Sequence, residues 1–537
     1  MSRVLRSWIP RIRPSILSRF GLLAIVCCMC GASVARADID AYEGQFGSVV
    51  MSGFVEAEGD IHTAQRNPNN FAQPGNPEIS LFQQWGLIDT TWQTPVEGLK
   101  FYARTRFFAN DTANVDPGNI RHYDAFPQRF AGDGAAFMQL ANDQVSLQGW
   151  EEWAQYQKGP LFVRIGKQTI VWGDVAPTRL LDDINPLDLS WHLTNEPLGR
   201  DVFDNLRIPL WAARASYQLP FLSRYDLQIE GYVSPDVFAF VPTVYPAYQN
   251  VSAGKVGSPL NILGFPSIVN FTDNVRDGRR GASGGVRLLG KIGELGWSLN
   301  WLERHDAFFI PVVQHVVPPP PYGPGLLIDV TGQHPRFDTV GASANYFEQK
   351  TGVVMRVETD WDIARPFENM TPLPVKGEPS VSAQNSEILR RDQYGYVVAF
   401  DRPTFLIPDA HHSASITFQF NGLVRQGGKY HLGQEGAAIS KDEEQFSFLF
   451  EQPMEGWDWR GWNGRYDEWF FDYTVLCSLQ NSAAMVPMVR WEPGNHWRFA
   501  TWFNWYMGPN KNSTFTTGGY GASAFTSGVS MSVSYLF

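Results

Sequence analysis

The sequence predicts an all-β fold, a transmembrane antiparallel β-barrel of about eighteen strands. Three observations predict it. The last residues alternate with a period of two, the first residues form an export signal, and alternating segments recur between connectors that are short and long in turn. Barrels of this class turn an apolar face toward lipid and a polar face toward the lumen.

The chain ends on an alternating strand, Phe525 to Phe537. Odd positions other than Ser527 are apolar, and even positions other than Leu536 are Gly, Ser or Thr. The ending resembles the closing strand of bacterial outer-membrane barrels, in which the barrel-assembly machinery reads a terminal Phe and an aromatic residue two positions earlier. Tyr535 and Phe537 are therefore the predicted assembly signal. Closure requires this strand to pair with the strand near Val49–Val55, because an open edge cannot face lipid.

The first 37 residues have the features of a secretory signal peptide. Residues 1–19 carry five Arg and no acid, Phe20–Cys30 is a short apolar run, and Ala35-Arg36-Ala37 supplies a cleavage site. A membrane anchor is the alternative, but the run is shorter than the ~20 residues that a spanning helix needs. We expect cleavage near Ala37 and a single barrel domain over residues 38–537, with Asp38–Gly47 as a lead-in.

Composition excludes several classes of protein. Cleavage removes three of the four Cys, so no internal disulfide is expected. It also removes six Arg and no acid, which takes the formal net charge from −11 to −17 and argues against nucleic acid as a partner. The 19 Trp and 19 Tyr suit aromatic girdles at membrane interfaces, although a sugar-binding all-β protein is equally aromatic.

The middle of the chain contains repeated alternating segments. In Leu99–Phe107, for example, Lys100, Tyr102, Arg104 and Arg106 share one face. Eighteen strands place both mature ends on the same side of the membrane, and sixteen strands are the alternative. The predicted strands are 48–58, 80–94, 98–109, 148–158, 161–171, 209–219, 225–234, 281–290, 296–305, 337–347, 353–362, 391–401, 413–425, 443–453, 467–478, 482–491, 497–507 and 523–537.

The connectors between these strands differ in length. Long connectors rich in Gly, Pro and Asn, such as 110–147, 235–280 and 364–390, alternate with short ones through the first two thirds of the chain. This is typical of long external loops and short periplasmic turns. We expect outer-membrane lipid around such a barrel.

The segment 172–208 is the first candidate for function. It follows a predicted strand directly and has no period of two, and Thr178–Ile184 could form one or two helical turns. Folded into the lumen, it would bring charged side chains near the pore axis; an ordinary external loop is the alternative. The constriction candidates on it are Arg179, Asp182, Asp183 and Asp188.

Charged residues on the polar faces of the strands are the second candidate. Opposed charges in a narrow lumen set ion selectivity, and the alternative is that they pair with one another and hold the wall rigid. These pore-lining candidates are Arg104, Arg106, Arg214, Glu230, Arg356, Glu358 and Arg498, with Arg287, Asp360 and Asp362 on similar faces.

Two motifs carry a family resemblance. One is Arg164-Ile165-Gly166-Lys167-Gln168 with Trp172-Gly173-Asp174 and Ile184-Asn185-Pro186-Leu187-Asp188; the other runs from Arg391 to Pro403. They resemble a family of proteobacterial outer-membrane barrels catalogued as a domain of unknown function, which is distantly similar to alginate-export-type barrels. The resemblance implies a large monomeric barrel with a transport role beside inner-membrane efflux systems.

These observations predict a porin-like channel for an unknown small solute. The alternative is a transport component for hydrophobic compounds or exported polymers that works with an inner-membrane transporter. A barrel that sheathes a haem protein is a third interpretation. No nucleophile, phosphate-loop, metal-ligand or haem motif occurs, so we expect no enzyme activity, no cofactor and no metal.

Overall fold

The structure is a computed structural model of the chain. It describes residues 39–62, 78–110, 138–141, 145–175, 179–187, 206–235, 259–262, 265–273, 282–307, 310–317, 326–375, 378–407, 412–427, 432–434, 437–454, 469–479, 482–493, 496–508 and 527–537. The predicted signal peptide, the predicted strand start at Phe525 and the candidate Asp188 lie outside these residues.

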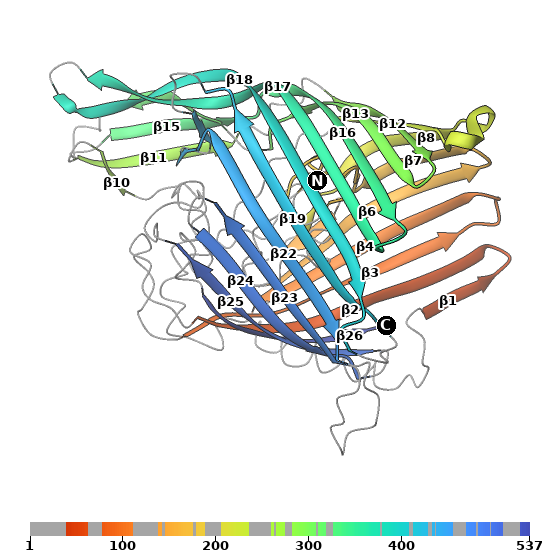
Figure 1. Cartoon of the computed structure of the whole chain (residues 1–537). Helices are drawn as coiled ribbons and strands as arrows, with labels where there is room; N and C mark the ends of the chain where they lie inside the picture. The colour runs from red at the N-terminus through yellow and green to blue at the C-terminus, as the bar shows by residue number, and fades with distance from the viewer. Residues whose placement is uncertain are drawn as a thin grey trace, which may run out of the picture.

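Eighteen antiparallel strands in the described residues close into one barrel, as the sequence predicts (Figure 1). Each pairs with the next along the chain, and the last pairs with the first. The barrel strands are β2 (Gly47–His62), β3 (Glu78–Gln93), β4 (Leu99–Asn110), β6 (Val145–Lys158), β7 (Leu161–Gln168), β8 (Leu210–Gln218), β9 (Gln228–Ser234), β12 (Ser283–Ile292), β13 (Leu295–His305), β16 (Arg336–Glu348), β17 (Val353–Val375), β18 (Glu378–Thr404), β19 (Ala414–Arg425), β22 (Asp442–Pro453), β23 (Trp469–Ser478), β24 (Ser482–Trp491), β25 (Trp497–Met507) and β26 (Gly528–Leu536).

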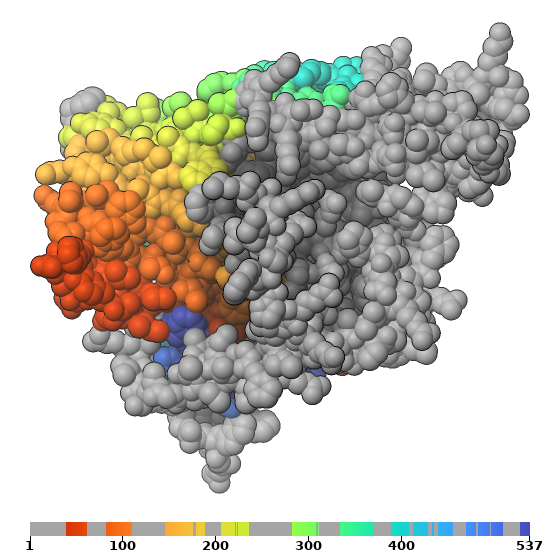
Figure 2. Space-filling model, turned by 180° about the vertical axis from the view of Figure 1, so that it is seen from behind, coloured from red at the N-terminus to blue at the C-terminus, as the bar shows by residue number. Residues whose placement is uncertain are grey.

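The two faces of each strand divide as the alternation predicts. On β26, Met531 and Val533 are 54% and 39% exposed, whereas Ser530 and Ser534 are buried on the inner side. Outward apolar residues recur on every side of the barrel, for example Ile165, Leu299 and Val357. An exposed apolar outer surface around a polar interior is the arrangement of a protein that spans a membrane. Seen from behind, the wall runs in chain order from β2 toward β9 (Figure 2).

The closing seam uses the whole free edge of β2. Phe54–His62 pairs with β26, and Gly53 and Phe537 exchange two backbone hydrogen bonds of 2.9 Å. The remaining edge, Gly47–Met51, pairs with β1 (Ile39–Gly44). The predicted pairing of the last strand with the strand near Val49–Val55 is thus confirmed, with the paired residues in the second part of β2, and the expected lead-in contains a strand. Phe537 is only 8% exposed, unlike the lipid-facing residues before it.

Short turns gather at one end of the barrel, which we call the turn end, and the opposite end is the loop end. The turn end holds the β3–β4, β6–β7, β12–β13 and β16–β17 turns and the C-terminus (Figure 1). The last third of the chain breaks the alternation. The β23–β24 connection at the loop end spans only 479–481, while the β22–β23 connection of 454–468 lies at the turn end.

Several connectors predicted as irregular loops contain strands. The 364–390 connector continues β17 and β18, with a bulge at Ala364, whose φ is 53°. Short strands β5 (Met138–Ala141), β20 (Leu432–Gln434) and β21 (Ala437–Ala438) join the barrel sheet. A separate sheet contains β10 (Pro259–Ile262), β11 (Phe265–Asp273), β14 (Ile310–Val317) and β15 (Leu326–Gln333) beside the loop ends of β17 and β18 (Figure 1).

Helix is scarce in the described residues. One 3-10 helix, Pro220–Tyr225, lies between β8 and β9. None of the helical segments in the described ranges is long and apolar enough to cross a membrane.

Deleting Phe537 should impair assembly of the barrel. The deletion removes two backbone hydrogen bonds to Gly53 and a buried ring from the seam, a loss of about 3–5 kcal/mol. The fraction of protein that resists unfolding in cold detergent on a gel should fall. The matched control is Met531→Ala, which truncates an exposed residue of the same strand. A normal folded fraction after the deletion would contradict the assigned role of the chain end.

Candidate functional site

An inward loop leaves the barrel wall directly after β7. We use this name for residues 169–187, of which 169–175 and 179–187 are described. Just before the loop, Gly166 has a φ of 135°, and a Cβ there would lie 2.3 Å from the Glu152 carbonyl oxygen. Only glycine tolerates that close approach. The predicted strand 161–171 therefore ends at Gln168, whose side chain donates to the Ala212 carbonyl at 2.9 Å.

The first part of the loop is anchored by Trp172. Its indole Nε1 donates to Glu230 Oε1 at 2.7 Å, and its ring packs edge-on to Tyr232 with centroids 5.4 Å apart. Glu230 also accepts from Arg214 Nε at 2.8 Å and from Arg287 Nη2 at 3.2 Å. The predicted pore-lining residues Arg214 and Glu230 thus form a part-buried ion-pair cluster that holds the loop.

The Glu358 carboxylate on β17 accepts three backbone N–H groups of the loop. Oε1 accepts from Asp174 and, at 3.2 Å, from Val175, while Oε2 accepts from Leu181 at 3.4 Å. Glu358 is 1% exposed. A carboxylate that receives several N–H groups replaces the water that an irregular segment would otherwise need. Glu358 therefore attaches the loop to the wall strand that faces it.

Asn185 fixes the far part of the loop. Its Oδ1 accepts from the Ile170 N–H at 2.9 Å, and its Nδ2 donates to the Ile208 carbonyl at 2.7 Å. The Ile208 N–H in turn donates to the Pro186 carbonyl at 2.8 Å. The Ile-Asn-Pro sequence is thus a structural clamp that brings the start and end of the connector together. Residues 179–184 contain no helical turn, contrary to the prediction for Thr178–Ile184.

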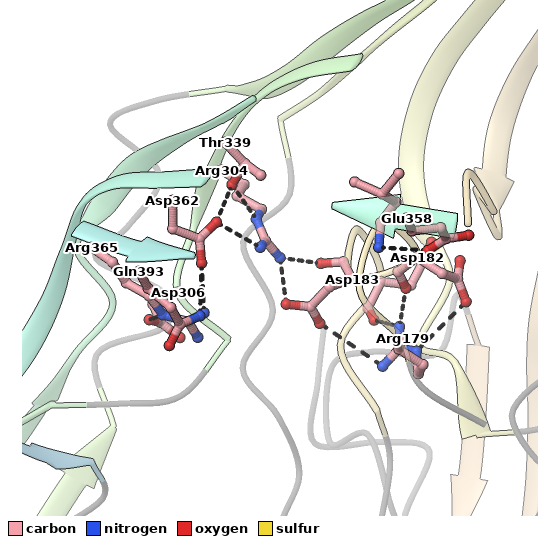
Figure 3. A network of polar contacts seen from close by, with 12 residues as sticks. Arg179, Asp182, Asp183, Arg304, Asp306, Thr339, Glu358, Asp362, Arg365 and Gln393 are labelled. Carbon is pink, nitrogen blue, oxygen red and sulfur yellow. Dashed lines mark hydrogen bonds and ion pairs between the residues drawn. The ribbon is translucent and has the colours of Figure 1, made fainter. Parts of the chain in front are cut away.

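Ion pairs link the loop to the wall (Figure 3). Asp183 accepts from Arg304 of β13, and Arg304 Nη2 lies 3.6 Å from Asp362 Oδ1. Asp362 also accepts from Arg365 Nη1 at 2.8 Å and from Gln393 Nε2 at 3.1 Å. This chain of contacts connects the loop with three wall strands, β13, β17 and β18.

Ion pairs also form within the loop and between the loop and Arg207, which follows it in the connector. Asp182 is paired with Arg207, and Arg179 Nη2 donates to the carbonyls of Asp182 and Asn185 at 2.6 Å each. Arg179 Nε lies 3.6 Å from the Asp182 carboxylate. Arg179 and Asp182 are therefore mostly engaged with the loop itself and do not extend as free charges into the lumen.

The two adjacent loop carboxyls have pKa values shifted in opposite directions. Burial raises the pKa of Asp182, although Arg179 and Arg207 oppose it. Burial also acts to raise the pKa of Asp183, but Arg304, Arg179 and Arg365 outweigh it and hold that pKa below its ordinary value. The Asp183 contribution to stability is therefore present above its unfolded pKa of about 3.9 and is lost as pH falls through the lower folded value. Because the folded pKa of Asp182 is raised, its contribution to stability is present below the unfolded pKa of about 3.9. That contribution is lost as pH rises through the higher folded value.

Glycines of the wall make room for the apolar side chains of the loop. A Cβ at Gly341 on β16 would lie 2.3 Å from Leu181 Cδ2, and one at Gly395 on β18 would lie 2.4 Å from Leu180 Cδ1. Leu181 is 1% exposed. The wall is thus complementary in shape to the loop. Residues of both the wall and the loop therefore determine the inward position of the loop.

The other predicted site residues also have partners. Arg104 forms two bonds to Asp89, of 2.7 and 2.8 Å, and Arg498 donates to Glu492 at 2.8 Å. Arg356 is paired with Asp401. Arg106 donates to Gln148 at 2.6 Å, and its guanidinium lies over the Trp150 ring. The structure does not bring these four arginines into the contacts of the loop.

Sequence reasoning missed Arg207, Arg304 and Asn185 as residues that hold the loop. Arg304 lies within the predicted strand 296–305 and has the inward parity of Ser298, Asn300 and Leu302, so the alternation of that strand could have identified it. Arg207 lies in a connector without periodicity, and no signal marked it.

A cavity of about 500 Å³ lies at the turn end beside Asp174 of the loop. Its wall includes Lys291, Asn345, Phe347 and Arg356 from β12, β16 and β17. In the described residues, no group of three or more His, Cys, Asp or Glu side chains is placed to hold a metal ion.

The fold and site define a transmembrane β-barrel with an inward loop. The chain matches the model of the family described as "Protein of unknown function (DUF1302)" over residues 19–376, and it belongs to that family. The resemblance drawn from the first motif is thereby confirmed, while Arg391–Pro403 lies outside the matched range. No curated protein matches the chain.

Several solved structures show low similarity to this chain. OccAB3 of Acinetobacter baumannii has 8% identity and a TM-score of 0.45, with 91% of this chain and 99% of that chain covered. OccK9 (OpdG) of Pseudomonas aeruginosa has 7% identity and a TM-score of 0.45, with 92% and 99% covered. OmpT, an outer membrane protein of Vibrio cholerae, has 8% identity and a TM-score of 0.37, with 93% and 99% covered.

Replacing Glu358 should loosen the inward loop in proportion to the number of acceptor oxygens that the substitution removes. Glu358→Ala leaves three loop N–H groups without their acceptor and should cost about 2–3 kcal/mol, whereas Glu358→Gln keeps one carbonyl oxygen and should cost about 1 kcal/mol. Hydrogen exchange of the Asp174 and Val175 amides measures the effect, with amides of β13 as the internal reference. Equal exchange in the wild type and Glu358→Ala would refute the assigned contact.

Gly341→Leu should displace the loop from the wall. The new side chain would occupy the space of Leu181, and overpacking of this kind costs about 1–3 kcal/mol. Trypsin should then cleave after Arg179, as detected by mass spectrometry. Ala342→Leu is the matched control, because its side chain points outward one residue along the same strand. Protection of Arg179 in both variants would show that the fit at Gly341 is not needed.

Proposed function

We propose that this protein is an outer-membrane channel for small solutes whose aperture is set by the inward loop. The observation that carries the proposal is the attachment of this loop to the inner faces of β9, β13 and β17 through Glu230, Arg304 and Glu358. A segment fixed across the lumen narrows the path and places charges beside it. A purely structural plug would also be fixed in this way, so conductance decides between them.

The proposed orientation follows the connector lengths. The turn end, with both chain ends of the described barrel, faces the periplasm, and the loop end faces outward. After cleavage near Ala37, the barrel-assembly machinery would recognise Tyr535 and Phe537. The cavity beside Asp174 would then form the periplasmic vestibule, where Lys291 and Arg356 meet the solute. An inner-membrane transporter is a proposed partner at this end.

Selection among solutes would arise from charges near the loop. Asp183 is 29% exposed in its ion pair with Arg304, so it can still act on a passing ion. Arg104 on β4 and Arg214 on β8 have side chains that are 20% and 18% exposed on the inner face of the wall. The site has no arranged nucleophile and base in the contacts described above, and we propose no enzyme activity.

Planar bilayers test the channel directly. Purified protein should give discrete conductance steps, and replacing residues 174–184 with a short Gly-Ser linker should increase their size because the segment that crosses the lumen is gone. Glu358→Ala is the second variant if the shortened chain does not assemble, and it should give larger or noisier steps.

Absence of conductance in the folded wild type and in both variants would reject the channel. A change in uptake or efflux of apolar compounds on loss of the gene would then favour the alternative. That alternative is a transport component for hydrophobic compounds or exported polymers working with an inner-membrane efflux system.

A further inference from the structure

A row of four polar residues crosses neighbouring strands on the inner wall. Lys100 of β4 lies opposite Gln155 of β6 in the strand register. Gln155 in turn lies opposite Arg164 of β7, and Arg164 lies opposite Arg214 of β8. We call these four residues the basic row. Their neighbours Phe101, Tyr156 and Ile165 are exposed on the outer face, so the row faces the lumen.

The charges of the basic row are not balanced. Glu230 pairs with Arg214, but it is shared with Arg287. Arg164 is bonded to the neutral Gln155 Oε1, at 2.7 Å from Nη2 and 3.2 Å from Nε. Within the described residues, no ion pair is formed by Lys100 or Arg164. Like charges on directly opposed residues, such as Arg164 and Arg214, destabilise a sheet.

Three other arginines of the wall differ in this respect. Arg104 has Asp89, Arg356 has Asp401 and Arg498 has Glu492 as an acidic partner. A carboxylate of the wall thus neutralises each of these three cations, whereas Arg106, like Arg164, is bonded to a carboxamide and lies over a Trp ring. In the basic row that position is taken by a carboxamide, which leaves positive charge for a ligand.

Aromatic rings hold the cations in place. The Arg164 guanidinium lies 3.8 Å from the Trp153 ring centroid and Lys100 Nζ lies 5.5 Å from it. Trp153 is in turn stacked on Tyr102, with centroids 4.8 Å apart. Contact with a ring face fixes a cation without using its N–H donors. The donors that remain suit the two oxygens of a carboxylate, and the rings suit an apolar body beside it.

We propose that the basic row binds small organic acids, through their carboxylate, and makes the channel prefer them. This inference rests on the proposed channel function and adds its substrate class. The carboxylate supplies the negative charge that the row lacks, and an apolar or aromatic body packs beside Trp153 and Tyr102. Chloride would be attracted by the same charge but would not gain the apolar contact.

Benzoate is the probe, and two measurements separate binding from conduction. Calorimetry on folded protein in detergent should show benzoate binding, and benzoate should reduce the chloride current in planar bilayers. Arg164→Gln and Lys100→Gln should each weaken both effects by roughly fivefold, because each removes one charge near the carboxylate. Arg164→Lys should restore part of the effect. Lys158→Gln is the control: it removes a 60% exposed charge, paired with Glu97, from the same β6–β7 hairpin.

The outcomes distinguish the two proposals. Benzoate binding without conductance would reject the channel and support the binding site. Conductance with equal benzoate effects in the wild type, Arg164→Gln and Lys100→Gln would keep the channel and overturn the inference. Equal effects of chloride and benzoate in these measurements would also overturn the inference, because they would show only a general attraction of anions.

Discussion

Backbone hydrogen bonding is the constraint on which this structure depends. A strand in lipid has no water to satisfy its N–H and C=O groups, so every edge must find a partner. The described barrel meets this demand at one strand, β2, whose free edge takes both β26 and β1. Once the edge is closed, the outer face needs only apolar side chains, and polar residues become free to line the interior.

The backbone groups of the inward loop also need hydrogen-bond partners, and they find them outside the sheet ladder. It leaves the sheet after Gln168 and loses ladder partners, so side chains of the wall replace them. Glu358 accepts N–H groups, Asn185 links the two parts of the connector, and Arg304 meets Asp183. The result is a segment positioned by charged groups together with buried apolar contacts, such as those of Ile170 and Trp172 with the wall. Glu230, shared by Trp172 and two arginines, shows how one carboxylate can serve both wall and loop.

Sequence reasoning predicted the barrel well because its signal is local. The alternation of β26 and the parity of Arg104, Arg214 and Glu358 follow directly from side chains that point to opposite faces. It failed where contacts are distant. The partners Asp183 and Arg304 are separated by more than one hundred residues. The extra strands β10, β11, β14 and β15 lie in segments that the prediction assigned to connectors.

The seam between β2 and β26 also has a consequence for folding. Ser530 donates to Asp60 across a separation of 470 residues, and Ser534 reaches Glu56 across 478. The contacts that close the barrel therefore form only after the last residue has been made. Folding dominated by such non-local contacts is slow, and it exposes unpaired strands in the meantime. The chain thus depends on protection from aggregation for the whole interval between export and closure.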